Sequence, residues 1–373
     1  MFALSWMGRH SIGLMSVNIE NKMQQLIGAG LATVDVREVR GWSPWHQHGM
    51  RTERATFVTP RDRFAFVKTI EILSASGITY ELVGGGTSTS RPSGGKVFID
   101  TKCLDQLTID PETQELVVGA GVAIDTAEAF VAPHGWTLGQ WLGSGSTATI
   151  GGAVATNASG ILAGRYGSFR DAISFVETID QTGSISWIDA KVFRPGDDVQ
   201  ILGARIPLWL SPDGRAVARF TGVIDTFAAL RQIATARLAP AHISVDHLGE
   251  ITVIVEGEPH LETARYQLIA AILQKHGAVQ DITLDQTQHW DSLLMANPWS
   301  ANAARGTWAD RIIQTAPWSD VKQQVETWST LAKRAAADLK WRAVNPSPNG
   351  VQLVIDISVS GTESEPHWLY EKA

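Results

Sequence analysis

The sequence predicts an α+β protein made of two consecutive domains, and three observations support this prediction. At 373 residues the chain is longer than one typical domain. Hydrophobic residues make up 44% of the chain and charged residues only 18%, so two separate cores can be filled. The pattern of expected strands and helices also starts afresh after a segment rich in Pro, Ser and Gly at about residues 207–214.

The first half is expected to contain an N-terminal arm followed by a sheet flanked by helices. The arm, residues 1–48, is weakly helical from Val17 to Leu31 and is broken by the turn-forming residues 41–45. Phe66, Ile70 and Leu73 then share one face of an expected helix. The close-set strands that surround it favour an α+β sheet over a regular doubly wound one. The expected elements are strands at 55–58, 79–83, 97–100, 107–109 and 116–118, and helices at 62–76 and 124–134.

The second half, residues 213–373, is expected to be a smaller α+β domain that would hold the substrate. Residues 49–212 would then form the first domain. The expected elements of the second domain are helices at 224–238, 261–276 and 321–340, and strands at 251–256 and 351–359.

Charge and cysteine content indicate a small-molecule partner. A net charge of −7 without a Lys/Arg block argues against a nucleic-acid groove or an anionic membrane surface. The lone Cys103 allows neither an internal disulfide nor a zinc cluster, so no metal site is expected. No apolar run approaches the length of a membrane span. We therefore expect a cytoplasmic protein, peripheral to a membrane at most, with a homodimer as one assembly.

A glycine-rich loop follows the strand expected at 79–83. Its sequence is Val-Gly-Gly-Gly-Thr-Ser-Thr, residues 83–89. Three glycines allow successive backbone N–H groups to turn inward as an anion-binding nest, and the hydroxyl groups add donors. A diphosphate would suit such a nest. The alternative is an ordinary tight loop, whereas a nucleoside-triphosphate loop would need a Gly-Lys-Ser/Thr ending that is not present.

A second block of small and hydroxylated residues spans 144–160. Small side chains allow close approach of the backbone to a flat ligand, and hydroxyls can satisfy phosphate and ring heteroatoms. The alternative is tight packing of a helix on a sheet. Two further glycine pairs, at 28–30 and 119–121, do not continue to the third glycine of a dinucleotide fingerprint, so a Rossmann site is not expected.

Taken in order and spacing, these segments resemble the FAD-binding domain of the p-cresol methylhydroxylase and vanillyl-alcohol oxidase superfamily. The resemblance covers about residues 51–180 and is carried by motifs at 83–88, 98–100, 109–110, 118–121, 134–139, 148–152 and 165–167. It implies a two-subdomain FAD-binding domain followed by a cap domain. Family members that attach flavin covalently through the first loop have a histidine where Thr87 stands, so the resemblance implies non-covalent FAD.

The resemblance also implies a set of cofactor-binding residues, with the first loop on the diphosphate and the second block on the flavin and ribityl chain. These residues are Val83, Gly84, Gly85, Gly86, Thr87, Ser88, Thr89, Ser144, Thr147, Ala148, Thr149, Gly151, Thr156, Asn157, Ala158, Ser159, Tyr166, Leu202 and Gly203.

The second half is similar in motif order to alkyldihydroxyacetonephosphate synthases, and FAD-linked D-lactate and glycolate dehydrogenases share the architecture. Two family features are missing: the Gly-Ser-Glu-Gly-Thr-Leu-Gly-Val cover, of which only residues 201–206 remain, and the His-rich motif expected beyond residue 367. A non-catalytic or truncated FAD-binding paralogue is therefore the alternative from another class. No catalytic residue is assigned; the scattered candidates are His247, His260, His276, His289 and Arg311.

Overall fold

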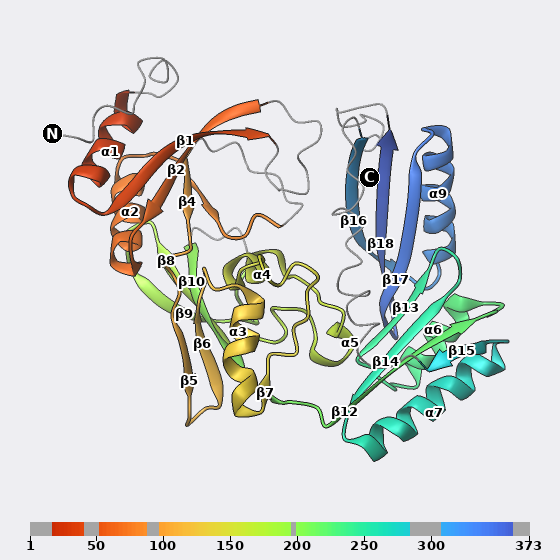
Figure 1. Cartoon of the computed structure of the whole chain (residues 1–373). Helices are drawn as coiled ribbons and strands as arrows, with labels where there is room; N and C mark the ends of the chain where they lie inside the picture. Colours follow the sequence, from red (N-terminus) through yellow and green to blue (C-terminus); the bar gives the residue numbers. More distant parts are fainter. Residues whose placement is uncertain (1–16, 41–51, 88–96, 195–198, 284–306, 361–373) are drawn as a thin grey trace.

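The computed structural model describes residues 17–40, 52–87, 97–194, 199–283 and 307–360 (Figure 1). These residues form three larger sheets and a two-stranded one. The first two sheets belong to the first half of the chain, and the third belongs to the second half. The α+β prediction is confirmed, with the first half organised as two subdomains.

The first sheet has the strand order β1-β2-β4-β3 and is covered by two helices. Helix α2 begins where the side chain of Asp62 accepts a hydrogen bond from the Ala65 amide (2.7 Å), which caps the helix N-terminus. The elements are α1 (Val17–Gly28), β1 (Ala32–Arg40), β2 (Thr52–Pro60), α2 (Arg63–Ala75), β3 (Glu81–Val83) and β4 (Val97–Asp100).

The segment expected as a separate arm is part of this sheet. Strand β1 runs antiparallel to β2 over its whole length, from Ala32 opposite Pro60 to Arg40 opposite Thr52. Met23 and Leu26 of α1 are fully buried in the same core as α2. The expected arm is thus corrected: because α1 has an apolar face and β1 is an alternating strand, both pack on the first domain.

The second sheet has the order β5-β6-β10-β8-β9, and α3 and α4 pack against it. The helix expected at 124–134 ends as α-helix at Val131 and continues as a 3-10 turn, since Pro133 lies there. The elements are β5 (Leu107–Asp110), β6 (Glu115–Gly119), α3 (Ile124–Val131), β7 (Trp136–Thr137), α4 (Ile150–Thr156), α5 (Ala163–Tyr166), β8 (Phe175–Asp180), β9 (Ile185–Asp189), β10 (Val199–Pro207) and β11 (Trp209–Leu210).

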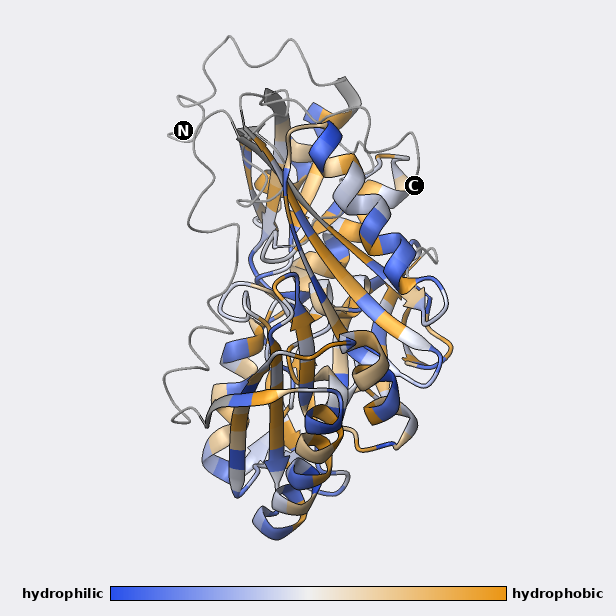
Figure 2. Cartoon of the chain, turned by 90° about the vertical axis from the view of Figure 1, so that its right-hand side faces the viewer, coloured by the Kyte–Doolittle hydropathy of each residue, from blue (hydrophilic) through white to orange (hydrophobic). Residues whose placement is uncertain are grey.

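The third sheet has seven strands in the order β15-β12-β14-β13-β17-β18-β16, with α6, α7 and α9 on one face (Figure 1). In Figure 2 the long strands of this sheet carry hydrophobic residues interspersed with hydrophilic ones, and the helices show both kinds as well. The elements are β12 (Gly214–Thr221), α6 (Thr226–Thr235), β13 (His242–Asp246), β14 (Ile251–Gly257), α7 (Pro259–Lys275), β15 (Val279–Thr283), β16 (Thr307–Pro317), α9 (Val321–Arg334), β17 (Asp338–Ser347) and β18 (Gly350–Ser360).

The helix expected at 321–340 was wrong at its C-terminal end. Helix α9 ends at Arg334, and β17 starts at Asp338. Ala336 adopts a positive φ of 51°, which turns the chain, and the amide of Ala337 donates back to the Ala332 carbonyl (2.9 Å). The alternating residues from Leu339 onward then form a strand instead of another helical turn.

Strand β14 is buried on both faces and connects the two halves. Val253 and Val255 face the core shared with α6 and α7. Ile254 faces the other way and packs with Leu162 and Tyr166 of the first half. The first half therefore covers the β12-β14-β13 part of the third sheet on the face opposite the helices.

A search of the helices in the described part of the chain finds none with the length and apolar character of a membrane span.

Candidate cofactor site

The two predicted cofactor segments lie directly against each other. A Cβ added to Gly84 would be 2.1 Å from Thr149 Oγ1, and one added to Gly85 would be 1.8 Å from the Thr147 carbonyl oxygen. Both distances are shorter than any contact a real Cβ makes. These glycines therefore let the loop after β3 approach the turn that precedes α4.

The loop offers backbone donors at this contact. Gly86 has a φ of +64°, the left-handed conformation that glycine adopts at little cost. Among the described residues, the amide N–H groups of Gly84, Gly85 and Gly86 donate to no protein acceptor. The Val83 carbonyl, by contrast, accepts from both the amide and the hydroxyl of Thr101 (3.0 Å each). Ser88 and Thr89 lie outside the described residues.

The second segment is a tight turn closed over Ser144. The amides of Thr147 and Ala148 both donate to the Ser144 carbonyl, at 2.9 and 2.7 Å. Thr149 then caps α4, because its hydroxyl oxygen accepts from the Gly152 amide (3.3 Å). The seven-residue α4 thus starts at the point where the first loop touches the second segment.

The glycine pair at 119–121 has a packing role. Gly151 of α4 packs on Ala120, where an added Cβ would lie 2.8 Å from the alanine Cβ. Cβ atoms on Gly119 and Gly121 would lie 2.2 and 2.0 Å from the carbonyl oxygens of Leu104 and Thr101. The turn at 119–121 therefore packs against α4. Its glycines are explained by these close contacts, and no dinucleotide-binding fingerprint is needed to account for them.

Leu202 and Gly203 lie behind this turn, inside β10. The Leu202 side chain is completely buried in the first core, and its carbonyl accepts from the Ala120 amide (2.9 Å). Gly203 is paired with Gly119 across the sheet, and an added Cβ would lie 2.6 Å from the Val118 carbonyl oxygen. Both residues hold the turn in place; direct cofactor contact by them stays a prediction.

The stretch after α4 curves towards the second domain. Asn157 has a left-handed backbone (φ 49°) and accepts from the Arg170 amide through its side-chain oxygen (3.0 Å). The carbonyl of Ala158 accepts from the Phe169 amide (2.8 Å). Ser159 lies at hydrogen-bond distance from Asn345 of the third sheet (3.4 Å). Thr156 is exposed, and its hydroxyl donates to the Gly152 carbonyl (2.8 Å).

Tyr166 lies between the domains and is only 5% exposed. Its ring contacts Gly139, which has a φ of +67°, and meets Trp209 edge-on with a centroid distance of 5.4 Å. Burial raises the pKa of Tyr166, and the adjoining Glu256 carboxylate raises it further. The hydroxyl therefore stays protonated, close to the second domain.

His242 is a buried interface residue that sequence reasoning missed. Its Nδ1 lies 2.7 Å from the Ile161 carbonyl oxygen, so Nδ1 donates, and Nε2 accepts from the Ser244 hydroxyl (2.9 Å). Burial lowers the pKa of His242 to about 4, so the ring is neutral at pH 7. The available signal was the polar alternation in His-Ile-Ser-Val-Asp, which is typical of a strand with one polar face.

The scattered candidates do not come together in the structure. His247 and His260 are exposed, and His276 ends α7, where Nε2 contacts Gln232 (3.0 Å). His289 and the Arg311 side chain lie outside the described residues. In the part of the chain that the structure describes, no group of three or more His, Cys, Asp or Glu residues could hold a metal ion.

Residues 55–189 match the family model of the FAD-binding domain. This chain carries an FAD-binding domain. The match includes the loop at 84–87, the turn at 144–149 and the stretch at 156–166, so the predicted FAD-binding domain is confirmed for this part of the chain and FAD is the cofactor.

Known proteins are similar to the FAD-binding domain and, more distantly, to the whole fold. A D-lactate dehydrogenase of Archaeoglobus fulgidus is 26% identical over 153 residues, which is 40% of this chain and 34% of that protein. An alkyldihydroxyacetonephosphate synthase of Caenorhabditis elegans is 29% identical over 136 residues, 34% of this chain and 23% of that protein. The chain thus aligns with about a third of the first relative and about a quarter of the second.

A solved structure of p-cresol methylhydroxylase with substrate bound shares the fold. The two structures superpose with a TM-score of 0.71 at 12% sequence identity. The alignment covers 92% of this chain and 84% of the p-cresol methylhydroxylase chain. The second domain is therefore part of the shared fold.

The residues present fit FAD. Within the described residues, the amides of the glycine loop have no protein acceptor and can donate to a diphosphate. A side chain on Gly84 or Gly85 would fill the space where the loop meets the turn. Ala148 and Ala158 have small side chains, and hydrogen bonds within the protein hold the backbone at both positions in place. Thr87, at the position of the covalent histidine, cannot form a histidyl link to flavin.

Proposed function

We propose that this protein is an FAD-dependent flavoenzyme of the oxidoreductase type that resembles alkyldihydroxyacetonephosphate synthase and holds FAD non-covalently. The observation that carries the proposal is the approach of the first loop to the turn before α4, made possible by Gly84 and Gly85. The loop would bind the diphosphate, and Ser144, Thr147 and Thr149 would line the ribityl chain and flavin.

The flavin supplies hydride or adduct chemistry when it is bound, and the protein must position the substrate. The third sheet has the groups for this on the face that meets the FAD-binding domain. Ser244, Gln352 and Asp356 lie on this face, because His242 on the same side of β13 contacts Ile161. We infer that the substrate binds between this sheet face and the flavin.

A second candidate function is an FAD-dependent D-2-hydroxyacid dehydrogenase acting on lactate or glycolate. Arg342 lies on the same sheet face, with its side chain 35% exposed and its Nη2 atom 3.8 Å from Asp356. The guanidinium is partly exposed, and such a group binds a substrate carboxylate through two parallel N–H donors. The similarity to a D-lactate dehydrogenase supports the same class.

The test begins with the colour of the purified protein. We expect a yellow protein that releases FAD on acid precipitation, because Thr87 cannot form the covalent link. Colourless protein that takes up no added FAD would refute the proposal, and flavin retained in the precipitate would refute only the non-covalent part.

Anaerobic mixing with candidate substrates then separates the functions. Fast, saturable flavin bleaching by D-lactate or glycolate supports the dehydrogenase, and Arg342→Met should raise the KM for either acid more than it lowers kcat. Spectral change with an acyl-dihydroxyacetone phosphate alone supports the synthase-like function. Stable FAD binding without a response to any of them supports a non-catalytic paralogue.

A further inference from the structure

The stretch 157–167 joins the predicted flavin-lining residues to the second domain. Besides the Ser159–Asn345 contact, the Ile161 carbonyl accepts from His242 (2.7 Å). Gly164 approaches so closely that an added Cβ would lie 2.5 Å from the Pro240 carbonyl oxygen. The position of the lining stretch therefore depends on the second domain.

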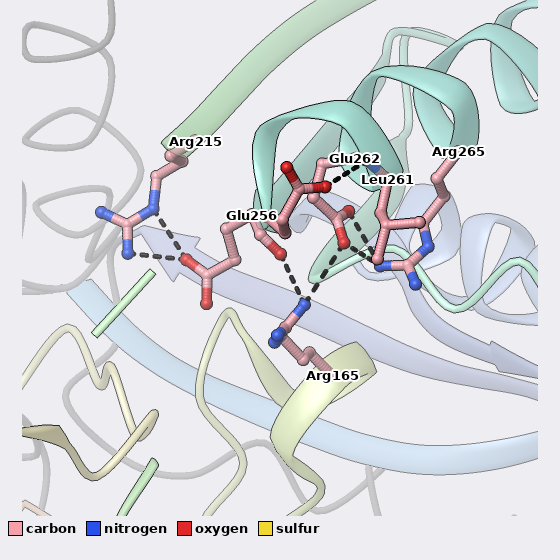
Figure 3. A network of polar contacts seen from close by, with 7 residues as sticks. Arg165, Arg215, Glu256, Leu261, Glu262 and Arg265 are labelled. Atoms are coloured by element: carbon pink, nitrogen blue, oxygen red, sulfur yellow. Dashed lines mark hydrogen bonds and ion pairs between the residues drawn. The ribbon is translucent and has the colours of Figure 1, made fainter. Parts of the chain in front are cut away.

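Arg165 makes the charged contact across this interface (Figure 3). Its Nη1 donates to the backbone carbonyl of Glu256 (2.5 Å) and lies 3.5 Å from the Glu262 carboxylate. Its side chain is 29% exposed and that of Glu262 only 9%, so solvent screens the pair incompletely. The Nη1 atom of Arg165, a residue of α5, thus contacts both the end of β14 and the first part of α7.

The surrounding charges are already paired within the second domain. Glu262 accepts from Arg265 of the same helix at 2.6 and 2.8 Å. The Glu256 side chain is fully buried and pairs with Arg215 (2.6 Å), whose guanidinium lies over the ring of Trp141 at 5.5 Å. Arg165 is therefore not needed to neutralise either carboxylate. Arg215 reaches the first domain through the ring of Trp141, whereas Arg165 reaches the second domain through a hydrogen bond and an ion pair.

We propose that Arg165 is a positioning residue for the flavin, because it holds the lining stretch 157–167 against the second domain. Arg165 directly precedes Tyr166 in the sequence, and its guanidinium lies 5.5 Å from the centre of the Tyr166 ring. Loss of the cation would leave the Glu256 carbonyl without its charged donor and let α5 shift. The inference rests on the proposed placement of the flavin beside residues 156–159 and 166.

The experiment compares Arg165→Met with Arg165→Lys and with Arg265→Met in the full-length protein. Arg265→Met is the matched control, because it removes the other cation on Glu262 but no contact between the domains. Arg165→Lys should rescue, since a single nitrogen makes both contacts and an ammonium can replace it. FAD affinity is measured by titration, and the flavin environment by visible circular dichroism.

We expect Arg165→Met to raise the Kd for FAD about tenfold and to alter the circular dichroism of the bound flavin. The Kd of Arg165→Lys for FAD should stay within about threefold of the wild-type value. Arg265→Met should match the wild type in both affinity and circular dichroism. Wild-type affinity and spectrum in Arg165→Met overturn the inference. So does an equal loss in Arg265→Met, because the effect would then come from Glu262 alone.

If Arg165→Met does not fold, Arg165→Gln replaces it, since glutamine keeps a polar side chain without the charge. Wild-type binding by Arg165→Gln overturns the inference, and weakened binding with an altered spectrum supports it. Wild-type protein that binds no FAD overturns the proposed function itself and the inference with it.

Discussion

Gly85→Ala is the smallest change that tests the cofactor site. The new Cβ would lie 1.8 Å from the Thr147 carbonyl oxygen, whereas ordinary van der Waals contact begins at 3.4 Å. The Cβ is attached directly to the backbone of the loop, and the oxygen belongs to the backbone of the turn. Neither atom can rotate away, so the loop and the turn must move apart. Forcing an extra carbon into a packed site costs about 1–3 kcal/mol.

This cost should appear mainly in cofactor binding. Without FAD the loop can relax away from the turn, whereas FAD binding requires their close approach. The strain is then added to the binding free energy and raises the Kd about 5- to 150-fold. The assay is titration of apoprotein with FAD, followed by flavin fluorescence, with thermal unfolding measured in parallel.

Gly28→Ala is the control, because an added Cβ there has no neighbour within 4 Å. It should bind FAD with wild-type affinity. If Gly85→Ala also bound FAD with wild-type affinity, the first loop would not be the diphosphate site, and the reasoning from steric fit would be wrong.

Three further outcomes follow from buried or strained residues. The pKa of His242 is lowered to about 4 by burial, so its unfolded form takes up a proton first as the pH falls below about 6.5. The free energy of unfolding should therefore fall from pH 6.5 towards pH 4, by up to about 3 kcal/mol. When this free energy is measured by urea unfolding at several pH values, it should change less with pH in His242→Gln. An equal change with pH in both proteins would contradict the buried neutral ring. Burial raises the pKa of the Cys103 thiol to about 12, so iodoacetamide should modify the native protein far more slowly than the unfolded protein, as mass spectrometry can show. Asn157→Ala should lower the unfolding free energy by about 1 kcal/mol and Asn157→Gly by less, because the backbone at 157 is left-handed; equal losses would point to the side-chain bond to Arg170 instead.

The first half was predictable because its glycines are explained by local chemistry. The loop at 84–86 follows a strand and has no side chains, which is enough to predict a nest. The pairing of β1 with β2 was not predictable, because the turn-forming residues 41–45 are only part of the segment 41–51 between the strands and do not specify a register. Strand β17 was missed because Ala335, Ala336 and Ala337 extend the helical pattern of α9 until the backbone turns.

The interface was the part that sequence reasoning could not find. Arg165 and Ile161 are far in the chain from Glu256 and His242, and each of these residues has an ordinary interpretation on its own. Only the packing of the second domain on the stretch around α5 brings Arg165 to Glu256 and Ile161 to His242. Tyr166 was predicted as a cofactor residue, and the structure adds that it lies beside Glu256, a contact that no sequence pattern indicated.

The pairing of β1 with β2 also determines how the protein can be shortened. A chain that began at Met15 would retain α1 and β1, whereas one that began at Met50 would leave the long outer edge of β2 with unpaired N–H and C=O groups. Such an open edge is a template for strands of other molecules. We expect the shorter chain to self-associate into aggregates although every residue matched by the FAD-binding family is still present.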